Sequence, residues 1–201
     1  MNIIIIAITV IVSIMAFYNS ALFERLKFSP YSIKNRKESW RFGSYALVHA
    51  GWLHLFINMF VLYSFGDIVE RAFRMVHGPK GLLYYLLFYI GGVIFSVLFD
   101  FGKYKNNVYY SAVGASGAVS AVVFSSILIF PRGSIYLFPI PFSIPSWLFG
   151  LLYLAYMIYM QKHGRDNVGH SAHFWGAVFG MVMTIILIPG VLHNFVLQMG
   201  F

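Results

Sequence analysis

The chain contains no cysteine and few charged residues, and both features limit the class of protein to which it can belong. Without cysteine there is no disulfide framework, thiolate nucleophile or cysteine-bound metal. Only 10% of the 201 residues are charged, whereas soluble domains carry about 25%. Charge runs, internal repeats and heptads are also missing, which excludes disorder, collagen and coiled coil. An aqueous globular protein is therefore nearly excluded.

Hydrophobic residues are abundant instead, at 60% of the chain, and the charges divide them into segments. This content suits six membrane-spanning helices of about 20 residues each. Five charged clusters leave six uncharged stretches, and backbone facing lipid must be satisfied within a helix. We expect helices over 2–22, 50–66, 81–99, 113–130, 146–161 and 169–188. The sequence predicts an all-α, six-helix transmembrane bundle forming a single domain over residues 1–201.

Several connections between these helices carry their own signals. Pro139, Pro141 and Pro145 mark a loop before the fifth helix, and Pro189 ends the sixth. Residues 3–18 lack the basic leader and the cleavage site of a signal peptide, which favours a retained helix. The formal charge of +8 would hint at nucleic acid in a soluble protein. In a membrane protein anionic lipid headgroups are the simpler partner, and we expect no nucleic acid and no cofactor.

Polar residues inside membrane helices are candidates for function, and here they gather at the starts of the second, fourth and sixth helices. These three helices run in the same direction, so their starts lie on one face of the membrane. Ser116 precedes fifteen uncharged residues, or about 22 Å of helix, and His173 lies about 24 Å from the end of its helix. His54 lies at a similar depth and Asn58 one turn deeper. The four side chains should converge.

Their chemistry suits acyl transfer. A serine and a histidine at one depth suggest a nucleophile and its general base, Ser116 and His173. His54 and Asn58 are four residues apart, share a helix face and can donate to a developing oxyanion. All six acidic residues sit in the charged clusters, so a Ser-His-Asp triad is not expected. A Ser-His dyad remains.

Three motifs around these residues resemble the signatures of the rhomboid intramembrane serine proteases. They are Gly114-Ala-Ser116-Gly117, His54-x-x-x-Asn58, and Ala-His173-x-x-Gly176-x-x-x-Gly180. Trp40-Arg41, followed by His49, resembles the loop motif of that family. The resemblance covers residues 40–180 in the right order and implies a six-helix, bacterial-type protease that cleaves transmembrane segments of other proteins near the membrane surface.

By resemblance, Ser116 is the nucleophile, His173 is the base, and His54, Asn58 and the Ser116 amide form the oxyanion site. The family often has an aromatic residue on the imidazole four positions after the nucleophile, where this chain has Ser120. Phe174, Trp175 or an aromatic from a neighbouring helix should then position His173. We expect that cavity to be filled, so that Ser120→Tyr overpacks it while Ser120→Ala is nearly neutral.

The membrane orientation has two opposing indications. Loops on the dyad side hold ten Lys and Arg residues and the other loops four, so the positive-inside rule puts the dyad toward the cytoplasm. The resemblance implies the extracytoplasmic side of a bacterial cell membrane. Six of the ten cations sit in the long first loop, and we follow the resemblance.

Plainer interpretations stand beside these. Gly114, Gly117, Gly176 and Gly180 also suit close helix packing, and Trp40 and Arg41 suit a structural or interfacial role. His49 and His170 suit structural hydrogen bonds. Two rival functions remain: an inactive relative that binds membrane helices, and a zinc hydrolase using the histidines at positions 49, 54, 170 and 173. A hydrolytic zinc site usually adds a carboxylate, which is not expected at this depth, so no metal is predicted.

Overall fold

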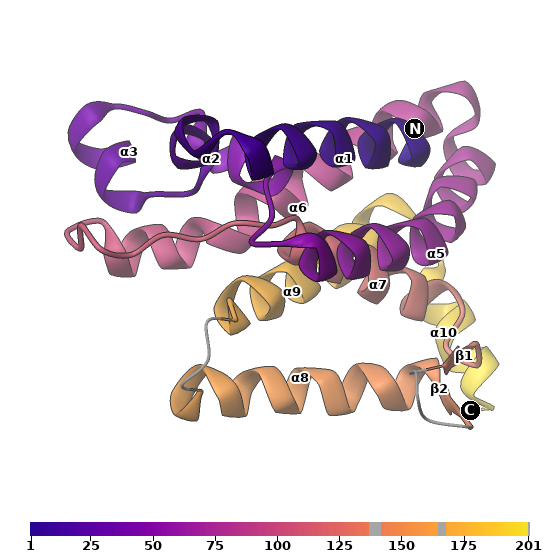
Figure 1. Cartoon of the computed structure of the whole chain (residues 1–201). Coiled ribbons are helices and arrows are strands. Elements are labelled where there is room, and N and C mark those ends of the chain that lie inside the picture. The colour runs from indigo at the N-terminus through magenta and orange to yellow at the C-terminus, as the bar shows by residue number, and fades with distance from the viewer. Residues whose placement is uncertain (137–141, 165–167, 201) are drawn as a thin grey trace.

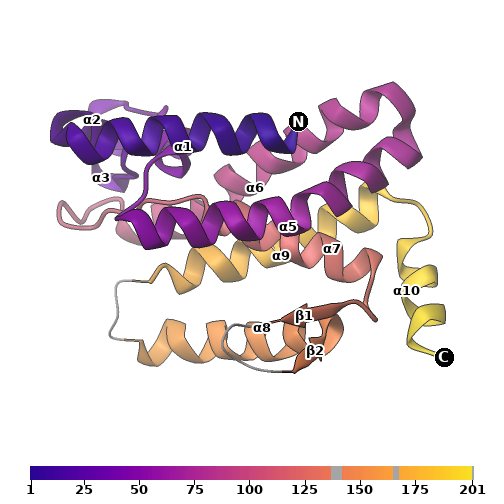
Figure 2. The ribbon, with the colours of Figure 1, turned by 45° about the vertical axis from the view of Figure 1, so that its right-hand side comes forward.

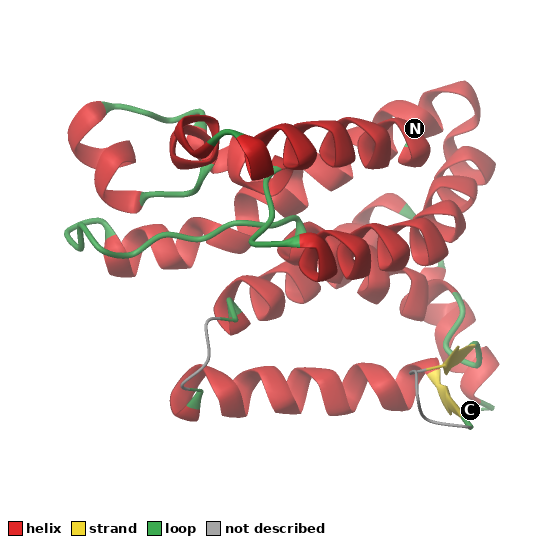
Figure 3. Cartoon of the chain, in the orientation of Figure 1, coloured by secondary structure: helices red, strands yellow, loops and turns green. Residues whose placement is uncertain are grey.

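The computed structural model describes residues 1–136, 142–164 and 168–200, and these are helical almost throughout (Figures 1 and 3). The predicted all-α class is confirmed. The long helices are α1 (Asn2–Tyr18), α5 (Trp52–His77), α6 (Gly81–Tyr104), α7 (Ser116–Ile129), α8 (Ser146–His163) and α9 (His170–Leu187). In the described part of the chain, two segments, 52–104 and 170–187, are long and apolar enough to cross a membrane, whereas α1 and α7 are apolar but shorter.

Short elements connect the long helices. They are α2 (Ser20–Leu26), α3 (Pro30–Arg36), α4 (Arg41–Ser44), η1 (Tyr45–Leu47), η2 (Gly78–Lys80), α10 (Val191–Met199), β1 (Ser134–Tyr136) and β2 (Ser143–Pro145). The two strands pair antiparallel, with Ile135 opposite Ile144. This pairing corrects the expectation of a plain loop before α8, although Pro139 and Pro141 lie outside the described residues.

Three predicted helix ends are wrong. The third helix runs to Tyr104 rather than to 99, past the charged Asp100 and Lys103. The other two have identifiable reasons. The first helix ends at Tyr18 rather than at 22, because Asn19 leaves the helical conformation and its side chain caps α2 by accepting the Leu22 amide. The second helix runs to His77 rather than to 66. Its charged residues did not end it, since Asp67 and Arg71 pair one turn apart, 2.7 Å between side-chain atoms, on its exposed surface.

Helix α7 is the centre of the fold. Every residue from Gly117 to Ile127 is buried, and α7 packs against α5, α6 and α9. Small residues such as Ala118, Ala121 and Ser125 let the surrounding backbones approach closely. Helix α8 is peripheral by contrast, with only Ser146, Gly150 and Met157 buried, and it forms the outermost layer below α9 (Figures 1 and 2).

The direction of the helices brings several helix starts together. Helices α5, α7 and α9 all begin at the end of the molecule where α2 and α3 lie, on the left of Figure 1. The start of α1 and helix α10 lie toward the opposite end (Figure 1). The polar residues at those three helix starts therefore lie toward the same end of the molecule.

Candidate active site

A cavity of about 1530 Å³ opens among the starts of α5, α7 and α9 and the facing side of α8. Its wall includes the four residues singled out from the sequence, Ser116, His173, His54 and Asn58. They come from three helices, and none of the four is strongly exposed. A serine, two imidazoles and an amide thus face one space at the level of the helix starts.

The turn before α7 sets the position of Ser116. Gly114 has φ +106°, a left-handed conformation that favours glycine, and a Cβ there would lie 2.6 Å from Cε1 of His54. The Gly114 amide donates to the Tyr45 carbonyl at 3.0 Å, and the Ala115 amide donates to Nε2 of His49 at 3.4 Å. The predicted role of Gly114 in close packing is therefore joined by a backbone requirement.

His49 connects this turn to α1. Because Nε2 accepts from Ala115, the neutral ring carries its hydrogen on Nδ1, which donates to Oγ of Ser13 at 2.9 Å. Ser13 in turn donates to the Leu47 carbonyl at 2.8 Å. His49 is fully buried and lies before α5 rather than within it. Its contacts are structural, as the sequence argument favoured, and they reach a helix that the argument did not connect to the site.

The packing of α7 on α9 sets the level of His173. A Cβ on Gly176 would meet the carbonyl oxygen of Gly117, and one on Gly180 would meet that of Ala121. These glycines therefore let the two backbones touch. Since Gly117 follows Ser116 and Gly176 lies one turn after His173, the same contact holds the nucleophile and the base candidates close along the helix axes.

The imidazole of His173 has no acidic partner in the described structure. Its Nδ1 is buried and, among the described residues, has no hydrogen-bond partner. The expectation that no acid reaches this level is wrong, because Asp100, buried near the end of α6, also lines the cavity. The carboxylate of Asp100 accepts from the Tyr110 hydroxyl at 2.8 Å. Asp100 is engaged by that hydroxyl, and the Ser-His dyad stays a prediction.

An aromatic ring from α8 lies beside the imidazole of His173. The ring of Tyr153 is nearly parallel to the imidazole, with 6.5 Å between centroids and 16° between planes, and its hydroxyl lies 3.0 Å from Oγ of Ser120. The sequence argument allowed for an aromatic from a neighbouring helix but could not name it. No motif or periodicity links position 153 to position 120.

His54 and Asn58 present donors to the cavity. Nδ1 of His54 accepts the Ala50 amide at 3.4 Å, so the hydrogen of the neutral ring lies on Nε2, beside Gly114. The Asn58 amide nitrogen donates one hydrogen to the His54 carbonyl at 2.9 Å and keeps a second. Both side chains therefore have a donor left for an oxyanion.

Arg41 and Trp40 belong to the surrounding loop rather than to the cavity wall. Arg41 is buried, pairs with Glu38 and donates to the carbonyls of Glu24 and Lys27 at 2.9 and 2.8 Å. It holds the loop together from inside. Trp40 is about half exposed, as an interfacial side chain would be.

The histidines do not form a metal-binding group. Within the described ranges no three His, Cys, Asp or Glu residues are arranged to hold a metal ion. His49 makes the contacts given above, and Nδ1 of His170 lies 3.4 Å from the Met157 sulfur. The structure therefore offers no support for the zinc alternative.

Comparison with known proteins identifies the family of this chain. Residues 36–190 match the Rhomboid domain. Rhomboid-related protein 2 of Mus musculus is 33% identical to this chain; the match covers 75% of this chain and 49% of the relative. The mitochondrial RHOMBOID-like protein 12 of Arabidopsis thaliana is 31% identical; the match covers 68% of this chain and 43% of the relative. Rhomboid protease AarA of Providencia stuartii is 26% identical; the match covers 79% of this chain and 60% of the relative. The chain thus spans about half the length of these relatives. Because the Rhomboid domain matches most of this chain, the chain belongs to the rhomboid family of integral membrane proteins.

Proposed function

We propose that this protein is an intramembrane serine endopeptidase that cuts transmembrane segments of other proteins near the membrane surface. Ser116 is the nucleophile and His173 the general base, while His54, Asn58 and the Ser116 amide receive the oxyanion. The observation that carries the proposal is the placement of all four side chains on the wall of one cavity. Relatives named as rhomboid proteases, AarA and GlpG of Haemophilus influenzae, support it.

The reaction follows from these groups. His173 takes the hydroxyl proton of Ser116 while the Ser116 oxygen attacks the scissile carbonyl. The resulting oxyanion accepts hydrogen bonds from His54, Asn58 and the Ser116 amide. When the tetrahedral intermediate collapses, His173 gives the proton to the leaving amine. Water from the cavity then attacks the acyl-enzyme, and His173 serves as base a second time. Without an acid on Nδ1, packing must orient the imidazole.

The membrane setting constrains the substrate. The six long helices span the bilayer in this proposal, with the cavity near the extracytoplasmic surface. A spanning helix protects its peptide bonds within its own hydrogen-bond ladder. The segment that is cut must unwind locally, so small or helix-breaking residues near the cut favour cleavage.

The decisive experiment incubates purified protein with a transmembrane substrate and maps the cut. Wild type should cleave and react with a fluorophosphonate at Ser116, whereas Ser116→Ala and His173→Ala should do neither while remaining folded. Ser64→Ala serves as the matched control, because Ser64 is exposed on α5, outside the cavity wall, and its hydroxyl donates to the Phe60 carbonyl of its own helix. EDTA should have no effect.

Two results would contradict the proposal. Cleavage by Ser116→Ala at the wild-type rate would remove the serine mechanism. Binding of the substrate by wild type without any cleavage or labelling would favour the inactive, helix-binding relative instead.

A further inference from the structure

Two contacts, one polar and one between rings, link three helices beside the dyad. Ser120, buried on α7 one turn below Ser116, lies with its Oγ 3.0 Å from the hydroxyl of Tyr153 on α8. The ring of Tyr153 lies almost parallel to the imidazole of His173 on α9. The contacts therefore run from the central helix, through the outermost helix, to the proposed base.

We propose that Tyr153 is a positioning residue for His173 and that Ser120 anchors it. This inference rests on the proposed function, in which His173 is the base. Tyr153 does not touch the reacting atoms; it acts through the orientation of the imidazole.

His173 needs such a residue because no hydrogen bond holds its Nδ1 in the described part of the chain. A histidine ring rotates in a broad energy well about its terminal torsion, and a hydrogen bond on Nδ1 is the usual restraint. Nδ1 of His173 has no partner among the described residues. Neighbouring Trp175 is turned elsewhere, stacked on Phe99 at 3.5 Å between centroids. Parallel, offset rings at the distance seen for Tyr153 are within the favourable range for aromatic pairs.

Tyr153 is itself held firmly. Its ring packs on Phe149 of α8 and Phe124 of α7, at centroid distances of 5.7 and 5.6 Å. The hydroxyl bond to Ser120 then fixes the end of the side chain. Helix α8 buries few residues, so this contact is one of those that hold α8 against α7. The sequence predicts that Ser120→Ala is nearly neutral, but from this contact we expect a loss, because that change leaves the Tyr153 hydroxyl without its partner.

The side chains at positions 120 and 153 compete for the same space beside His173. Tyr153 occupies the volume that an aromatic ring at position 120 would need, so Ser120→Tyr alone should lose activity. In the double variant Ser120→Tyr/Tyr153→Ala, the new tyrosine on α7 places a ring beside the imidazole again. The double variant should therefore recover part of the activity that Tyr153→Ala loses. Rescue of this kind separates positioning from a general packing role.

The test measures the rate of fluorophosphonate labelling in detergent, because this small probe needs the dyad but not the entry of a transmembrane substrate. We expect Tyr153→Leu to lower that rate and the turnover of a transmembrane substrate by a similar factor, up to about 100-fold. Tyr153→Phe and Ser120→Ala should each lower both by about 2- to 10-fold, and together by no more than either alone. Tyr159→Leu, an exposed tyrosine of the same helix outside the cavity wall, should leave both unchanged.

A second measurement does not depend on activity. In protein with ¹⁵N-labelled histidine, the His173 ring signals, assigned by their loss in His173→Ala, should be sharp in wild type and broadened in Tyr153→Leu. Wild-type labelling and unchanged His173 signals in folded Tyr153→Leu would overturn the proposal. A wild type that is not labelled at all would refute the protease function instead, and the His173 signals would still decide the role of Tyr153.

Discussion

At the scale of single residues, Asn58 is the clearest candidate for a purely catalytic contribution. It is buried at the cavity wall, and its amide keeps one hydrogen beyond the bond to the His54 carbonyl. Removing one oxyanion donor typically slows the chemical step by about 100- to 1,000-fold. We expect Asn58→Ala to lower kcat within that range while KM changes little, because the donor acts only on the developing charge. Single-turnover cleavage measures this directly, and an unchanged kcat would exclude Asn58 from the mechanism.

The same scale shows what the sequence could predict about the site. Depth along the helices and the spacing of His54, Asn58, Ser116 and His173 were enough to predict that they gather. Tyr153 could not be predicted, because its partner Ser120 lies on another helix and their meeting depends on how α8 leans on α7. Asp100 was missed for a related reason, since a charge near a helix end can point back into a cavity as well as outward.

At the scale of elements, the contact of α7 with α9 is the one that glycine makes possible. A methyl group on Gly176 would overlap the carbonyl oxygen of Gly117, which is backbone and cannot rotate away. We expect Gly176→Ala to force the helices apart, cost about 1–3 kcal/mol of stability and strongly reduce fluorophosphonate labelling. Thermal unfolding in detergent and the labelling rate measure the two effects.

Gly102→Ala is the matched control for that prediction. Gly102 lies in α6 with no heavy atom within 4 Å of its ideal Cβ, so alanine there should keep activity and slightly raise stability through its helix propensity. Equal behaviour of the Gly102→Ala and Gly176→Ala proteins would show that α7 and α9 tolerate separation.

Element boundaries were harder to predict than the elements themselves. The charged clusters predict helix ends, yet α5 carries Asp67 and Arg71 on an exposed surface where they pair with each other. Conversely, α1 stops at Asn19, an uncharged residue whose side chain caps the next helix. Hydrophobic runs report burial in lipid or protein, whereas helix ends depend on local hydrogen bonds that a run does not reveal.

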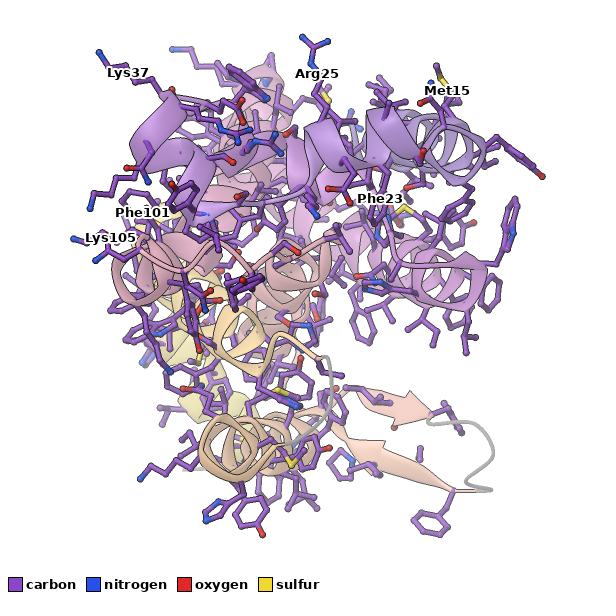
Figure 4. All side chains as sticks on the ribbon, turned by 60° about the vertical axis from the view of Figure 1, so that its left-hand side comes forward. Met15, Phe23, Arg25, Lys37, Phe101 and Lys105 are labelled. Atoms are coloured by element: carbon purple, nitrogen blue, oxygen red, sulfur yellow. The ribbon has the colours of Figure 1, made fainter. Side chains whose placement is uncertain are left out.

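At the scale of the whole molecule, the charge distribution and the site give opposite indications of orientation. The end of the molecule that holds the cavity also carries α2, α3 and the loop after α6, and Figure 4 shows Lys37 and Lys105 pointing outward there. By the positive-inside rule, ten Lys and Arg residues on that side against four on the other would favour the cytoplasm. Arg41 is one of the ten, but it is buried among loop carbonyls and does not face the membrane surface.

The absence of cysteine allows a direct test of orientation with minimal change. Tyr109, 92% exposed in the loop between α6 and α7, reports the cavity side, and Met75, 83% exposed near the end of α5, reports the other side. Neither Tyr109→Cys nor Met75→Cys alters the charge that the positive-inside rule counts. In intact cells, a membrane-impermeant maleimide should label Tyr109→Cys and leave Met75→Cys unlabelled until the membrane is opened. The reverse pattern would mean that the cations of the first loop determine insertion, and the cavity would then act on the cytoplasmic side.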